Sequence, residues 1–196
     1  MKKIKIKISP LVWVMGAALV FFHDSTAAEI CTILSAALIH EGGHIAAAKI
    51  LKIPIKCMRL DIFGAIIETD LLLCSYKKEA VLCLSGPLAN IVSVIIVSTF
   101  RLPFDIGFFK IASLFFAVIN LLPAKGFDGG RAISCLLFSK LNSRTAANLM
   151  YVSSFICVFL LWTVSVYFIM RTGSYLSLFV FSAALFSKLF LSPDSQ

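Results

Sequence analysis

Charged residues are scarce in this chain of 196 residues, where Asp, Glu, Lys and Arg together make up 14% and only 10 residues are acidic. Hydrophobic residues make up 60%, and the mean hydropathy is +0.97. This balance excludes an ordinary water-soluble domain, in which about a quarter of the residues are charged. Repeats, linkers and low-complexity tracts are also absent from the sequence. We therefore expect residues 1–196 to form a single membrane domain.

Paired cysteines and basic stripes are missing as well. The six Cys show no C-x-x-C spacing, so a cysteine zinc site is not indicated, and we expect these residues to be small buried hydrophobes. The net charge of +8 comes from basic residues dispersed among apolar segments, without the interleaved aromatic residues of a nucleic-acid surface. The expected surroundings are a lipid bilayer, and no nucleic-acid partner is expected.

Long apolar segments are what the chain has instead. A membrane span needs about 20 mostly apolar residues. Six segments approach this length, at residues 8–22, 29–51, 78–100, 106–122, 145–170 and 174–191. The predicted fold class is an all-α polytopic membrane protein with about six transmembrane helices. The first segment has an alternative interpretation as a signal peptide, because four Lys precede it and Thr26-Ala27-Ala28 resembles a cleavage site.

The distribution of Lys and Arg predicts the orientation of these spans. With a cytoplasmic N-terminus, the loops around 52–78 and 123–144 and the C-terminus also lie inside. Of the 18 Lys and Arg, only Arg101, Lys110 and Arg171 then lie near the outer ends, as the positive-inside rule requires. We expect a multi-pass protein of the bacterial cytoplasmic membrane with both termini in the cytoplasm.

The segment His40-Glu41-Gly42-Gly43-His44 is an HExxH pattern inside an apolar run. Residues four apart on a helix return to nearly the same face, about 6 Å along the axis, so that two imidazoles can bind one Zn²⁺. Glu41 is placed to take a proton from the attacking water. The alternative is a pair of core histidines. The pattern predicts a zinc metalloprotease site within a membrane.

A third metal ligand must lie on the same side of the membrane as His40 and His44. The predicted topology puts His23 in an outer loop, which excludes it. The carboxylates on the correct side are Asp61, Glu68, Asp70, Glu79 and Asp128. Asp128 is favoured because it follows the apolar span 106–122 and because Gly129-Gly130 would let the backbone approach the metal closely. The alternative for Asp128 is a helix cap.

Three segments together resemble a known family. His40–His44, Ser85-Gly86-Pro87-Leu88-Ala89-Asn90 and the stretch from Asn120-Leu121-Leu122-Pro123 to Asp128-Gly129-Gly130 are similar to the three signatures of the site-2 protease family of intramembrane zinc metalloproteases. The resemblance covers about residues 8–190. The segment Asn120–Arg131 looks most like the bacterial sporulation branch, the stage IV sporulation protein FB group, which cleaves a membrane-associated sigma-factor precursor.

The resemblance implies roles for individual residues. It implies that His40, His44 and Asp128 hold one Zn²⁺ per chain and that Glu41 is the catalytic base. Asn90 and Asn120 match positions near the site, where an amide would orient substrate, although each alone is more often an interhelical polar residue. The implied partners are a membrane-tethered protein substrate and a membrane-protein inhibitor or activator. No CBS or PDZ domain is expected within residues 1–196.

Residues 55–70 are rich in β-formers around Phe63-Gly64 and are too short and too charged to span a membrane. They predict a short β-hairpin, which the resemblance places at the membrane. Its edge, near Gly64 and Ile66, would bind an unwound substrate as an added strand. The alternative is an ordinary cytoplasmic loop.

The residue Glu41 also bears on the competing functions. A membrane zinc transporter would be expected to show paired repeats, which are not seen. A proteolytically silent scaffold would be expected to have lost Glu41.

The segment 40–44 departs from an ordinary helix in one respect, because Gly42 and Gly43 together cost about 2 kcal/mol of helix stability relative to Ala. We expect close approach of a neighbouring helix to compensate for this cost.

Overall fold

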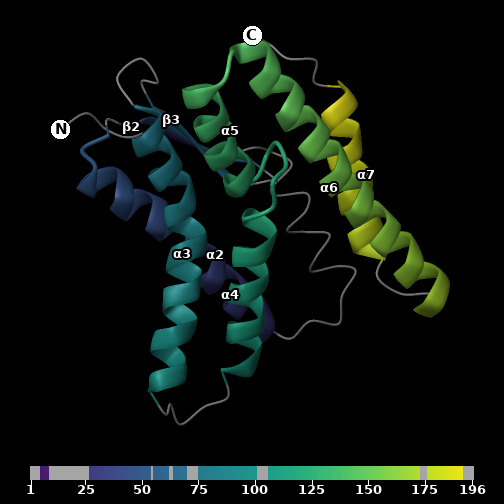
Figure 1. Ribbon diagram of the computed structural model, residues 1–196. Helices are drawn as coiled ribbons and strands as arrows, with labels where there is room; N and C mark the ends of the chain where they lie inside the picture. The colour runs from purple at the N-terminus through teal and green to yellow at the C-terminus, as the bar shows by residue number, and fades with distance from the viewer. Residues whose placement is uncertain are drawn as a thin grey trace.

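The computed structural model describes residues 5–8, 27–53, 55–61, 64–69, 75–100, 106–172 and 176–191. Helices make up most of this part of the chain, as predicted (Figure 1). They are α2 (Ala27–Ile50), α3 (Tyr76–Thr99), α4 (Gly107–Asn120), α5 (Asp128–Lys140), α6 (Ser143–Thr172) and α7 (Leu176–Leu191).

Three helices, α2, α3 and α6, are long and apolar enough to cross a membrane. The 24 residues of α2 and of α3 extend about 36 Å each, more than the roughly 30 Å of a hydrocarbon core. The helix α4 has 14 residues and extends only about 21 Å. It begins one residue later and ends two residues earlier than the predicted span 106–122. The predicted span 8–22 lies outside the described residues beyond Ile8. The count of six spans therefore stays a prediction.

The helix α3 is central to the fold, because it packs against α2, α4 and α5. Figure 1 shows α2, α3 and α4 as one group, with α6 and α7 paired beside it and α5 between the two groups. Small residues make the α3–α5 contact, where Ala80 and Cys83 meet Ala132 and Cys135. Small side chains let helices approach closely inside a membrane.

A three-stranded sheet accompanies the helices. Antiparallel strands β2 (Ile55–Asp61) and β3 (Gly64–Thr69) occupy the segment where the hairpin is predicted. A third strand, β1 (Lys5–Ile8), pairs in parallel with the other edge of β2, so the order is β1-β2-β3. The strand β1 was not predicted from the sequence, and Ile8 belongs to this strand rather than to the first span. Among the described strands, β3 therefore keeps an outer edge.

A short turn, residues 121–127, joins α4 to α5. It is closed by hydrogen bonds from Ala124 N–H to the Leu122 carbonyl and from Phe127 N–H to the Ala124 carbonyl. A Cβ added at Gly129 would strike the Leu121 backbone, and one at Gly130 would strike the Ala124 backbone. The expectation that these two glycines let the backbone approach a metal stays a prediction. They let α5 pack against the turn, and this packing fixes where α5 begins.

The two glycines of α2 differ in their surroundings. A Cβ at Gly43 would lie 2.5 Å from the Ser85 carbonyl oxygen and 2.6 Å from Ala89 Cβ, so α3 approaches α2 at this residue as expected. A Cβ at Gly42 would meet nothing within 4 Å among the described residues, and nothing in the structure explains a glycine there. The crossing at Gly43 places the middle of α3 directly beside His40 and His44.

Candidate metal centre

The two histidines of α2 point into the protein. Each is only 4% exposed, and their Nε2 atoms lie 3.3 Å apart. Their ring centroids are 4.9 Å apart with the rings nearly perpendicular. The spacing of four residues on a helix accounts for this pair, because it returns the chain to the same face after one turn.

Asp128, the first residue of α5, completes the cluster. Its Oδ2 lies 2.9 Å from His40 Nε2 and 3.1 Å from His44 Nε2. The helix cap is Phe127 and no side-chain capping hydrogen bond is made, which argues against the cap interpretation of Asp128. Burial alone would raise the pKa of Asp128, but the hydrogen bonds to the two histidines outweigh burial and lower the pKa to about 2. The side chain is therefore a carboxylate at neutral pH.

The three atoms have the spacing of a metal site. Zinc bound by nitrogen and oxygen at about 2.0–2.1 Å in tetrahedral geometry separates its ligand atoms by about 3.3 Å. The three separations here are 2.9, 3.1 and 3.3 Å. The residues His40, His44 and Asp128 are thus a group that can hold a metal ion. Two imidazoles and one carboxylate leave the fourth position of a tetrahedral ion for water or substrate.

The protein also fixes the orientation of His44. Its Nδ1 lies 2.8 Å from the Leu82 carbonyl oxygen, to which it donates, so in a neutral ring Nε2 carries the lone pair. The Ser85 hydroxyl, 3.3 Å from the same Nδ1, also donates to the Leu82 carbonyl. A lone pair that faces a carboxylate oxygen at 3.1 Å is repelled unless a proton or a cation lies between them. This donor set fits a bound cation.

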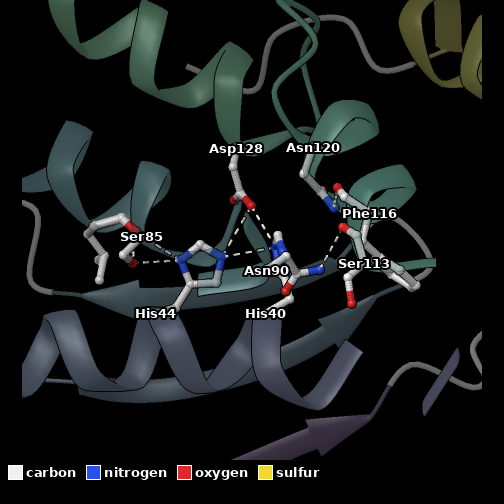
Figure 2. A network of polar contacts seen from close by, with 9 residues as sticks. His40, His44, Ser85, Asn90, Ser113, Phe116, Asn120 and Asp128 are labelled. Atoms are coloured by element: carbon white, nitrogen blue, oxygen red, sulfur yellow. Dashed lines mark hydrogen bonds and ion pairs between the residues drawn. The ribbon is translucent and has the colours of Figure 1, made fainter. Parts of the chain in front are cut away.

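Gly86 on α3 leaves the space that the metal centre occupies (Figure 2 shows the neighbouring Ser85). A Cβ at Gly86 would strike His44 Nε2 and would lie 2.8 Å from His40 Nε2. Any side chain at this residue would therefore fill the cluster itself. From the sequence, Gly86 was singled out only as one residue of the motif Ser85–Asn90. Its role could not be predicted, because it depends on how α3 crosses α2.

Asn90 lies one turn after Gly86 and is fully buried. Its Nδ2 donates to the Ser113 carbonyl of α4 at 3.3 Å, which is the interhelical contact expected of an isolated Asn. Asn120 donates to Phe116 of its own helix at 3.0 Å. Figure 2 shows both amides beside the histidines and Asp128. Within the described part of the chain, Asn90 Oδ1 and His40 Nδ1 are buried without a hydrogen-bond partner.

The other candidate site residues that the structure describes do not belong to the cluster of His40, His44 and Asp128. Glu79 lies 3.6 Å from Arg131, in an ion pair between α3 and α5. Glu41 is partly buried, and its charge acts on His44. The positions of His23 and Asp70 lie outside the described residues, as do the side chains of Asp61 and Glu68. Among the described residues the metal-ligand group is the one that contains Asp128.

Of the four cysteines whose burial the structure describes, two are buried as predicted, Cys157 is half-buried and one is exposed. Cys83 and Cys135 lie in the α3–α5 contact, whereas Cys31 is exposed on α2. Burial and the neighbouring Glu79 carboxylate raise the pKa of the Cys135 thiol to about 12. The thiol therefore stays protonated at neutral pH and behaves as a small apolar group.

Comparison with known proteins finds similarity in both sequence and structure. No protein-family model matches the chain. It is 33% identical over 174 residues to stage IV sporulation protein FB of Bacillus subtilis (strain 168), an alignment that covers 81% of this chain and 56% of that relative. It superimposes on the site-2 protease from Methanocaldococcus jannaschii with a TM-score of 0.62 and 19% identity, over 100% of this chain and 96% of the other.

The chain therefore has the fold of a site-2 protease and is similar in sequence to a sporulation protein of Bacillus subtilis. Because the chain spans about half the length of the sporulation relative, that alignment concerns the part shared by the two proteins. The structural similarity, at 19% identity, shows that the fold of a site-2 protease is present. The chemistry of this chain is argued from its own residues.

Proposed function

We propose that this protein is an intramembrane zinc metalloprotease that cleaves a transmembrane or membrane-tethered regulatory protein. The convergence of His40, His44 and Asp128 supports the proposal most directly, since three buried ligand atoms lie within 4.8 Å of one another. These residues would hold one zinc ion. When bound, zinc would lower the pKa of water and polarise the scissile carbonyl.

Glu41 supplies the acid–base chemistry in this proposal. It follows His40 directly on α2 and is partly buried, and its carboxylate is proposed to reach the attacking water without binding the metal. It accepts a proton from the attacking water and then gives a proton to the leaving amine. Asn90 and Asn120 are proposed to orient the substrate, and the buried Asn90 Oδ1 is an acceptor that the described protein leaves unused.

Access to the site is proposed from the cytoplasmic side. His44 lies six residues before the end of α2, about 9 Å along the helix from the end that the charge pattern places inside. The parallel pairing of β1 with β2 supports a common membrane side for the N-terminal segment and the loop after α2. The proposed setting is the bacterial cytoplasmic membrane, with both termini in the cytoplasm.

A labelling experiment tests this topology. A cysteine introduced at Ser75, the exposed residue that caps α3, should react with a membrane-permeant maleimide and resist an impermeant one added outside intact cells. The parent protein, treated in parallel, accounts for labelling of its own cysteines. Reaction with the impermeant reagent would reverse the proposed orientation.

The outer edge of β3 is proposed to receive the substrate. A helical substrate hides its carbonyls in hydrogen bonds, so the segment to be cut must unwind first. An unwound segment can pair with a free strand edge. In the described sheet both edges of β2 are paired, so β1 and β3 each keep an outer edge, and the edge proposed for the substrate is that of β3, the strand that carries Gly64 and Ile66. The hairpin is proposed to lie at the membrane surface.

Replacing Ile66 by Pro should impair substrate cleavage more than zinc binding. Proline removes one backbone N–H from β3, and a single hydrogen bond accounts for up to about tenfold in kcat/KM. The measurement is kcat/KM together with zinc content, with Ile66→Val as the control that keeps the N–H. Equal cleavage by the Pro variant would favour an ordinary loop with no role in substrate binding.

Co-expression tests the proposed activity. The chain would be produced with candidate membrane-tethered regulators, and their fragments followed by immunoblot, beside a matched Glu41→Gln variant. A fragment that depends on Glu41 is expected. If every candidate stays intact with both proteins, although zinc is bound, a scaffold function would be favoured instead.

The physiological substrate is proposed from the resemblance of Asn120–Arg131 to the sporulation branch of the site-2 proteases. Because stage IV sporulation protein FB is 33% identical to this chain, we propose a sporulation sigma-factor precursor as the membrane-associated substrate. A gene deletion tests this assignment. Spores that form normally, with the precursor still processed, would exclude the sporulation role and leave the protease proposal intact.

A further inference from the structure

The turn that precedes Asp128 is bound to α6 by two adjacent serines. The Ser153 hydroxyl donates to the Pro123 carbonyl at 2.6 Å. The Ser154 hydroxyl accepts from Lys125 N–H at 2.8 Å and donates to the Met150 carbonyl of its own helix at 2.6 Å. The partners lie 29 and 30 residues apart in sequence, so these are tertiary contacts rather than helix capping.

The surroundings make these bonds costly to lose. Ser154 is 1% exposed, and Ala124 and Phe127 of the turn are buried against Val158 of α6 and Leu185 of α7. A buried backbone N–H group without a hydrogen-bond partner is costly wherever it lies. Ser154 is the partner that satisfies Lys125 N–H, and no water need reach the turn at this point.

Backbone hydrogen bonds link this turn to the start of α5, where Asp128 lies. Phe127 N–H bonds to the Ala124 carbonyl, and Arg131 N–H bonds to the Phe127 carbonyl. The backbone of Gly130 lies against that of Ala124 closely enough to exclude a Cβ. A displacement of residues 123–125 would therefore move the start of α5, and with it the Asp128 carboxylate that lies 2.9 and 3.1 Å from the two histidines.

We propose that Ser154, supported by Ser153, is a positioning residue that holds Asp128 at the metal centre by fixing the turn 121–127 to α6. This inference rests on the proposed function, because it assumes that Asp128 binds zinc. It assigns to α6 a role in metal binding, although the described part of α6 contributes no ligand to the cluster.

The chain offers a matched control for this proposal. Ser165 lies on the same helix, is fully buried, and shares a hydrogen bond with Ser182 of α7 at 3.1 Å. It is eleven residues from Ser154, which is about 16 Å along α6. Ser165→Ala therefore removes a buried serine hydroxyl and a tertiary contact without touching the turn.

The test measures zinc affinity of the purified full-length protein by competition with a chromophoric chelator, and the visible spectrum of the cobalt-substituted protein. Ser154→Ala is expected to weaken zinc binding by about 10- to 100-fold and to change the cobalt spectrum, because the Asp128 carboxylate would no longer be held in place. Losing a group that orients a metal ligand typically has an effect of this size. Ser154→Thr keeps the hydroxyl and should restore affinity to within about threefold, since a helical Thr can still bond to the carbonyl four residues earlier. Ser165→Ala should also stay within about threefold of the parent.

Equal zinc affinity of the Ser154→Ala and Ser165→Ala proteins would overturn the proposal while leaving the zinc site standing. If Ser154→Ala does not fold, Ser153→Ala serves as the second variant. It removes only the bond to Pro123 and should weaken zinc binding by about three- to tenfold, so parental affinity in that variant would overturn the proposal as well. Failure of the parent protein to bind zinc would instead overturn the proposed function on which the inference rests.

Discussion

Replacing Glu41 by Gln is expected to lower peptide hydrolysis by about 10²- to 10⁴-fold while zinc stays bound. The amide has nearly the shape of the carboxylate but cannot accept a proton from water. The three ligand atoms belong to His40, His44 and Asp128, so the change leaves them in place. The measurement is turnover of a membrane-tethered substrate by the purified, zinc-loaded variant, with zinc content determined on the same sample.

The control for this variant is Glu29→Gln. It makes the same chemical change on the same helix, about 18 Å away from Glu41, and should keep parental turnover. Turnover by the Glu41→Gln protein close to that of the Glu29→Gln protein would show that Glu41 is not the base. Loss of zinc from the Glu41 variant would instead assign it a structural role at the site.

The second large effect is expected at Gly86. Replacing it by Ala should weaken zinc binding by at least about 100-fold and reduce activity in parallel, because the new methyl group would strike His44 Nε2 and press on His40 Nε2. To accept the methyl group, α3 must move away from α2, and the contact at Gly43 with Ser85 and Ala89 would then open.

Gly42→Ala is the matched control for Gly86→Ala. It also adds one methyl group within a helix, but in a place where the described protein has nothing within 4 Å. Its zinc affinity should equal that of the parent, and its helix should gain up to about 1 kcal/mol in stability. Zinc affinity and unfolding in detergent would be measured on both proteins. Parental zinc affinity in Gly86→Ala would show that α3 does not enclose the metal.

The candidate metal ligands could be predicted because each is marked in the sequence by its spacing or by its chemical type. His40 and His44 follow from a spacing of four on a helix, and Asp128 was favoured from its place after an apolar segment. The packing of the two glycines that follow Asp128 was not predicted. Gly129 and Gly130 contact the backbones of Leu121 and Ala124, and only the folded turn shows this.

Other features depend on contacts between distant segments. Gly86, Ser153 and Ser154 lie in apolar runs, where a glycine or serine is not distinctive until its neighbour across the helix contact is known. The strand β1 did have a local signal, the alternation of Lys and Ile at Lys5–Ile8. That alternation was attributed to a basic segment before a span, because strand β2, its partner, lies about fifty residues later in the sequence.

Zinc analysis of the purified protein, combined with X-ray absorption at the zinc edge, tests the central claim most directly. One zinc per chain is expected, bound by two imidazole nitrogens and by oxygen, with no sulfur ligand. Asp128→Asn should weaken its binding by about 10- to 100-fold, because an anionic ligand is replaced by a neutral amide. Sulfur ligation, absence of zinc from the folded protein, or unchanged affinity in Asp128→Asn would contradict the site described here.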